Sequence, residues 1–174
     1  MDADVQPTSM GDIMWRGCLI LLILPLVLML GFCGWVRWES PRGALPPEVE
    51  WDEIIAFGED FGLRDGCGFG AYHISPETSL RFVEGRDLPV GWYRTPLPME
   101  DGQYAYVGPD RKRITLYAHH GTTCASKKGK RLGLPDRYQR ALRGPGNWYR
   151  ISNHGEGLIV VSPKEALAWY LYFG

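Results

Sequence analysis

The 174-residue chain has few cysteines, almost no net charge and only one long apolar run. Four cysteines are too few for a disulfide-dense miniprotein. A composition of 45% hydrophobic and 22% charged residues excludes a disordered chain. A single apolar run excludes a polytopic membrane protein, because each helical span needs about 20 apolar residues. No repeat is visible, so length and composition predict one globular domain plus one further segment.

The sequence also lacks the short motifs that would identify a reaction. It contains no H-E-x-x-H or C-x-x-C metal motif and no G-x-S-x-G nucleophile turn. The glycine- and lysine-rich stretch 121–133 has the composition of a phosphate-binding loop without the G-x-x-x-x-G-K-[ST] spacing. We therefore predict no cofactor and no catalytic residue from motifs.

The apolar run, residues 17–36, contains no charged residue. A helix of 20 residues covers about 30 Å, the thickness of a hydrocarbon core. Its two ends carry tryptophans, which favour the headgroup layer: Trp15, Trp35 and Trp38. We predict a tail over residues 1–16 and a transmembrane helix over residues 17–36. A cleaved signal peptide is the alternative, although its apolar part is usually about 7–15 residues long.

The orientation of this helix is less strongly determined by the sequence. Arg16 precedes the run, and Arg37 and Arg42 follow it, so the bias of basic residues slightly favours a cytoplasmic C-terminal domain. The short lead, however, is typical of a signal anchor. We predict a single-pass protein of the bacterial inner membrane whose C-terminal domain is extracytoplasmic, in the periplasm.

Cysteine usage favours the same side of the membrane. Cys67 and Cys124 are the two cysteines outside the apolar run, and both lie near glycines, where backbones can approach closely. A disulfide between them would close a long loop and stabilise the domain by about 4 kcal/mol. Such a bond forms in an oxidising compartment. Two buried free thiols are the alternative.

The remainder predicts an α+β domain over residues 48–174 after a proline-rich linker, residues 37–47. We expect one helix to begin after Pro47 and a second, short helix over residues 136–143. The capping-box sequence at residues 162–165 predicts a third helix, buried because its residues are apolar all round. Antiparallel hairpins are expected from the strands at 68–75 with 79–84, 103–107 with 113–119, and 147–152 with 157–161.

Charge is strongly segregated along the domain. Residues 39–101 hold 13 acidic and 5 basic residues, whereas residues 111–150 hold 11 basic residues and one acid, Asp136. The second block predicts a protein partner with an acidic surface, because opposite potentials attract and tyrosine, tryptophan and arginine are enriched in binding hot spots. Internal cancellation of the two blocks is the alternative, and nucleic acid is disfavoured by the absence of any recognition motif. The predicted binding residues are Arg137, Arg140, Arg143, Trp148 and Tyr149.

Histidines offer an alternative, enzymatic interpretation. His119 and His120 are adjacent, and neighbouring strand residues point to opposite faces, so a metal site would need one of them together with His73 or His154. An envelope hydrolase or a metal-dependent enzyme is therefore a competing hypothesis, and no metal site is predicted. A structural subunit assembled through the apolar helix is a third.

The arrangement of one span followed by a small domain resembles the single-span extracytoplasmic domains of bacterial envelope proteins. These include immunity proteins that block secreted antibacterial toxins. The likeness concerns architecture alone and assigns no residue. It implies a membrane-anchored binding module, with an inhibitor or immunity-type protein as the version to test first.

Overall fold

The computed structural model describes residues 23–32, 34–35, 42–61, 66–100, 103–107, 113–115, 118–152 and 156–174. The chain divides into two units, Met1–Arg42 and Gly43–Gly174. The division falls within the residues predicted to form the linker, 37–47.

The first unit is described only in part. Residues 23–32 and 34–35 are helical, and apolar side chains such as Leu30 and Phe32 are more than half exposed. Among the residues that the structure describes, none belongs to a helix with the length and apolar character required to span a bilayer. The rest of the predicted span (residues 17–22, 33 and 36) and the tail over residues 1–16 lie outside the described residues.

The second unit combines an antiparallel sheet with short helices, which confirms the predicted α+β class. Six strands form one sheet in the order β1-β2-β9-β8-β7-β3, and β4, β5 and β6 form a smaller one. The elements in chain order are β1 (Trp51–Phe61), β2 (Gly66–Ile74), α2 (Pro76–Glu84), β3 (Tyr93–Arg94), β4 (Met99–Glu100), β5 (Gln103–Val107), β6 (Arg113–Thr115), η1 (Ala118–Cys124), α3 (Lys127–Arg131), α4 (Leu134–Arg143), β7 (Trp148–Ser152), β8 (Gly157–Ser162), η3 (Pro163–Glu165) and β9 (Leu167–Phe173).

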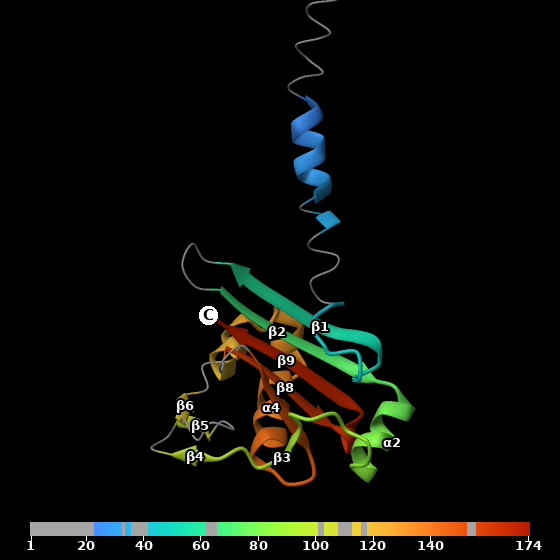
Figure 1. Cartoon of the computed structure of the whole chain (residues 1–174). Helices are drawn as coiled ribbons and strands as arrows, with labels where there is room; N and C mark the ends of the chain where they lie inside the picture. The colour runs from blue at the N-terminus through green and yellow to red at the C-terminus, as the bar shows by residue number, and fades with distance from the viewer. Residues whose placement is uncertain are drawn as a thin grey trace, which may run out of the picture. The chain divides into compact units, whose positions relative to one another are not determined.

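The last strand in the sequence lies in the interior of the large sheet. β9 pairs antiparallel with β2 on one side and with β8 on the other, so that Trp169 lies opposite Ala71 and Val160. The neighbouring strands β7 and β8 form the hairpin predicted at residues 147–161. Figure 1 shows α4 behind these strands and α2 at one end of the sheet.

The prediction of a C-terminal helix is wrong. The capping-box residues form only the short 3-10 helix η3, and the residue that follows it, Ala166, has a left-handed backbone (φ 52°). The chain then enters β9. A segment that is apolar on every side fits an interior strand, buried on both faces, as well as it fits a buried helix.

The helix predicted after Pro47 is also wrong, because residues 51–61 form β1. Two register shifts interrupt its pairing with β2, between Trp51 and Glu53 and between Ile54 and Ala56. Each shift breaks the two-residue alternation of a strand. Trp51, Ile54 and Phe57 consequently pack against the same cluster at three-residue spacing, which imitates a helical face.

The strand predicted at residues 79–84 is helix α2. The Ser75 hydroxyl accepts a hydrogen bond from the Thr78 backbone amide at 3.1 Å, and Pro76 occupies the first helical turn. Gly85 ends the helix with φ 66°. These are ordinary start and stop signals of a helix, and they outweigh the β-propensity of the short segment between them.

Two other predictions are confirmed at least in part. The helix expected at residues 136–143 is α4, and β5 pairs antiparallel with β6 as predicted. The strand expected over residues 113–119 is shorter, since β6 ends at Thr115 and residues 118–124 form η1. The turn expected at residues 108–112 lies outside the described residues.

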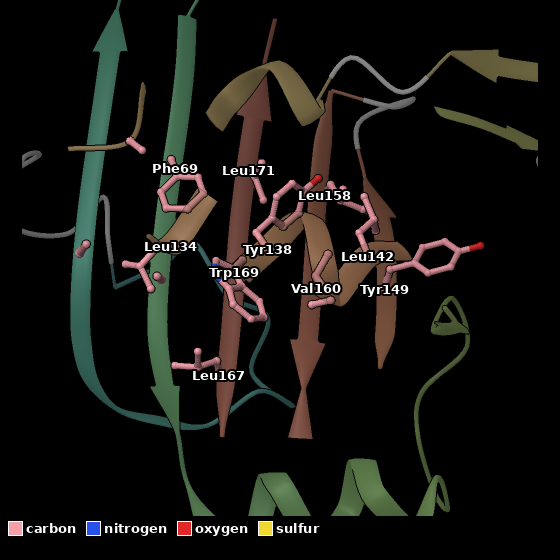
Figure 2. Packing of buried hydrophobic residues seen from close by; sticks show 14 of the residues in the cluster. Phe69, Leu134, Tyr138, Leu142, Tyr149, Leu158, Val160, Leu167, Trp169 and Leu171 are labelled. Atoms are coloured by element: carbon pink, nitrogen blue, oxygen red, sulfur yellow. The ribbon is translucent and has the colours of Figure 1, made fainter. Parts of the chain in front are cut away.

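The large sheet separates two hydrophobic clusters. In the first cluster, α4 contributes Leu134, Tyr138 and Leu142, and the Tyr138 ring lies next to that of Trp169 of β9 (Figure 2). In the second, α2 contributes Phe82. Since residues of β2, β8 and β9 alternate between the two clusters, these strands are buried on both faces.

Candidate binding surface

Helices α3 and α4 form the part of the sequence with the strongest positive charge. Ser126 begins α3, where its hydroxyl accepts a hydrogen bond from the Gly129 amide at 3.3 Å. Gly133, with φ 64°, lies between the two helices. The buried face of α4 belongs to the first cluster, which fixes the opposite face toward solvent.

The basic side chains lie on that solvent side. We call the basic residues of α3 and α4 the basic surface. The two helices contain a single acidic residue, Asp136. Six members of the basic surface are exposed and Arg137 is half-buried. Such a concentration of one sign favours association with an acidic surface. The exposed members are Lys127, Lys128, Lys130, Arg131, Arg140 and Arg143.

The predicted binding arginines differ in their surroundings. Arg137 donates from Nε and Nη2 to Glu165 Oε2, at 3.1 Å and 2.7 Å, so its charge is partly neutralised. Arg140 is exposed and forms no ion pair with any described residue. Arg143 is exposed at the end of the same helix. Arg140 is therefore the most direct probe of this surface.

The two predicted binding aromatics do not lie on the basic surface. Trp148 is 8% exposed and Tyr149 is 5% exposed. Trp148 Nε1 donates to the Phe82 carbonyl at 2.7 Å, and Arg94 lies 4.4 Å from its ring centre. Burial, and to a lesser extent Tyr93, raises the pKa of Tyr149. The structure assigns both rings to the cores, as the usual use of large aromatics predicts.

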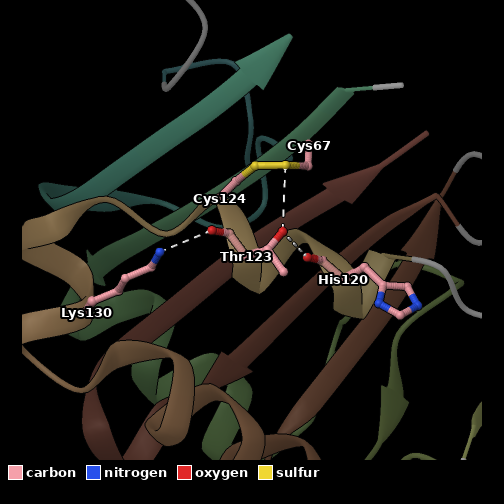
Figure 3. Close-up of a disulfide and its surroundings, with 5 residues drawn as sticks. All are labelled: Cys67, His120, Thr123, Cys124 and Lys130. Carbon is pink, nitrogen blue, oxygen red and sulfur yellow. Dashed lines mark hydrogen bonds between the residues drawn. A yellow bond between two sulfur atoms is a disulfide. The ribbon is translucent and has the colours of Figure 1, made fainter. Parts of the chain in front are cut away.

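The sequence-predicted cysteine pair is brought to disulfide distance. The Cα atoms of Cys67 and Cys124 lie 6.0 Å apart, so the bond joins the start of β2 to the end of η1 (Figure 3). Close backbone packing supports it, because a Cβ at Gly121 would lie 2.6 Å from Gly68 O and 2.7 Å from Tyr172 O. Only glycine allows η1 to approach the sheet this closely.

The histidines that the structure describes do not form a common site. His73 Nδ1 lies 2.7 Å from Asp52 Oδ1, and both side chains are about half exposed. The His120 ring lies 5.4 Å from that of Phe173, and η1 rather than a strand carries His119 and His120. His154 lies outside the described residues. Within the described part of the chain, no group of three or more His, Cys, Asp or Glu could hold a metal ion.

Part of the segregated charge is neutralised inside the domain. Arg150 of the basic block forms an ion pair with Glu48 of the acidic block, and the same carboxylate accepts a hydrogen bond from Trp92 Nε1 at 3.1 Å. The exposed bases of α3 and α4 lie outside this contact. Pairing inside the domain therefore accounts for Arg150 and for part of the charge of Arg137, while the other basic residues of α3 and α4 are exposed.

A cluster of one carboxylate and three tyrosines was not foreseen from the sequence. Glu59 of β1 and Tyr72 of β2 belong to it, together with Tyr170 and Tyr172 of β9. Burial, then Glu59, then Tyr172 raise the pKa of Tyr170. The two-residue spacing of Tyr170 and Tyr172 was the available signal, but it has no meaning on the helix that was predicted there.

Comparisons with known proteins assign no family to this chain. No protein family, curated protein or solved structure gives a significant match.

Proposed function

We propose that this chain is a membrane-anchored, extracytoplasmic protein-binding module whose basic surface binds an acidic protein partner. Inhibition of that partner, as by an immunity-type protein, is the version to test first, because it requires affinity and no catalytic groups. The observation that carries the proposal is the set of exposed bases on α3 and α4, opposed there by one acid.

Support for the anchor comes from the first 42 residues taken alone. Residues 17–36 contain no charge, a length and composition that match a bilayer core. The described part of this run is helical, and its apolar side chains are exposed, as in Leu28 and Leu30. Support for the oxidising side comes from the cysteine pair at disulfide distance.

The basic surface can be tested by reversing charge at Arg140. The full chain, solubilised in detergent and immobilised, is used to capture its partner from an envelope extract, and the bound amount is quantified. Arg140→Glu, alone or with Arg143→Glu, is expected to reduce partner recovery about tenfold, because each reversal places like charges opposite each other.

The control is Arg86→Glu, which reverses an exposed arginine of the acidic block, 4.0 Å from Glu84. This variant changes net charge by the same amount as Arg140→Glu and is expected to retain the partner. If all variants recover the same amount of partner, or if Arg86→Glu loses as much partner as Arg140→Glu, the basic surface is not the binding site.

A further inference from the structure

The cluster of Glu59 and the tyrosines lies on the face of the large sheet opposite the first hydrophobic cluster, and away from α2. Glu59 of β1, Gly68 of β2 and Tyr172 of β9 are in register across three neighbouring strands. The adjacent row contains Phe57 and Tyr170. Side chains in register on one sheet face lie close enough to interact directly. The consecutive strands β1 and β2 and the C-terminal strand β9 thus place a carboxylate and two tyrosines together.

Gly68 forms the floor of this cluster. A Cβ built on it would lie 3.6 Å from Tyr170 Cε1, 3.7 Å from Glu59 Cγ and 3.8 Å from Tyr172 Cβ. These are ordinary van der Waals distances, so the three side chains border the place that a side chain at Gly68 would occupy. Glu59 is exposed, and both tyrosines are half-buried. Gly68 beneath them is buried, so a ligand group arriving from solvent contacts the exposed parts of these three side chains.

The chemistry of the cluster favours a cation. The faces of tyrosine rings carry partial negative charge, and a nearby carboxylate adds a full one. Tyr170 keeps its proton because burial and Glu59 both raise its pKa. A planar guanidinium can stack on a ring while it pairs with a carboxylate, which an ammonium does less well.

The position and the charges of β1 indicate which kind of molecule carries this cation. β1 is the terminal strand of the large sheet, so an extended segment could pair along its outer edge. Its four charged residues are all acidic and exposed, which disfavours pairing with β1 of a second copy and favours a basic segment. These residues are Asp52, Glu53, Glu59 and Asp60.

We propose that Glu59, Tyr170 and Tyr172 bind an arginine side chain of an extended basic segment of a partner protein that docks along β1. This site lies on the opposite face of the sheet from α4 and uses none of the residues of the basic surface. It is a second interface, and it does not depend on the function proposed above.

The test uses the full chain in detergent micelles with ring-labelled tyrosine, titrated with the peptide acetyl-Val-Arg-Val-amide. The tyrosine ring signals in NMR spectra report binding, and their loss in Tyr170→Phe and Tyr172→Phe assigns them. The arginine peptide is expected to shift both signals in a saturable way. The same peptide with neutral citrulline in place of arginine is expected to bind at least about fivefold more weakly.

Matched variants separate the site from general charge effects. Glu59→Gln and Tyr170→Leu are expected to weaken the arginine peptide at least about fivefold. Glu77→Gln, at an exposed acid of α2, and Arg140→Glu are expected to leave it unchanged. Gly68→Ala fits sterically and fills the floor, so it is expected to weaken binding while the domain stays folded. It provides the decisive comparison if another variant fails to fold.

Equal binding of the arginine and citrulline peptides would overturn the proposal, as would unchanged binding in both Glu59→Gln and Gly68→Ala. A third outcome would also contradict it: concentration-dependent shifts of Tyr170 and Tyr172 without peptide, abolished by reversing charge at Arg140 and Arg143. That result would identify the basic surface of a second copy as the occupant.

Discussion

Replacing Trp169 with alanine is expected to lower the free energy of unfolding by about 3–5 kcal/mol. Trp169 is fully buried in β9, at 0% exposure, between β2 and β8. Its ring lies 6.5 Å from that of Tyr138, in an edge-to-face arrangement. Truncation removes this contact and leaves a cavity under α4 that the sheet cannot close, because its neighbours are fixed by pairing on both sides.

Denaturant unfolding of the full chain in detergent, followed by near-UV circular dichroism, measures this loss. The control is Tyr172→Ala on the same strand, where the side chain is half-exposed and the loss should be clearly smaller. A loss below about 1 kcal/mol at Trp169 would mean that β9 is not an interior strand. Deleting residues 169–174 is expected to abolish folding, because it removes most of β9 from the interior of the sheet.

Replacing Cys67 and Cys124 together with serine is expected to lower the free energy of unfolding by about 4 kcal/mol. The two residues are 57 positions apart, and a bond across a loop of that size restricts the unfolded chain more than the folded one. Denaturant titrations of oxidised wild type and of the variant give the difference directly.

Two controls define the source of this effect. A reductant should destabilise the wild type to the level of the variant and leave the variant unaffected. Cys18→Ser with Cys33→Ser, both within the apolar run, should leave unfolding of the domain unchanged. If a reductant leaves the wild type unchanged, and the variant with serine at Cys67 and Cys124 is as stable as the wild type, these two cysteines are not bonded in the protein.

The fold could be predicted where local signals agree with tertiary structure. The β7–β8 hairpin and α4 were foreseen, because their alternation, turn residues and helix-stop glycine all indicate the same elements. β9 was not, since periodicity cannot distinguish a buried strand from a buried helix. β1 was missed because Trp51 and Ile54 lie three residues apart, as on a helix, where bulges interrupt its pairing with β2.

The candidate sites, too, could be predicted from the sequence only in part. The basic surface follows from the charge pattern, since clustered bases on an amphipathic helix such as α4 remain on its exposed face. Trp148 and Tyr149 were predicted to join it, but adjacent strand residues point to opposite faces and here enter the two cores. The cluster around Gly68 depends on strand order, which no local pattern contains.

The most direct measurement of the central proposal is the compartment in which the domain resides. Reporters attached through a flexible linker to Gly174, one active only outside the cytoplasm and one only inside it, read out its side of the membrane. We predict a membrane-bound product with activity of the external reporter alone. A freely soluble intact product, or activity of the internal reporter alone, would contradict it.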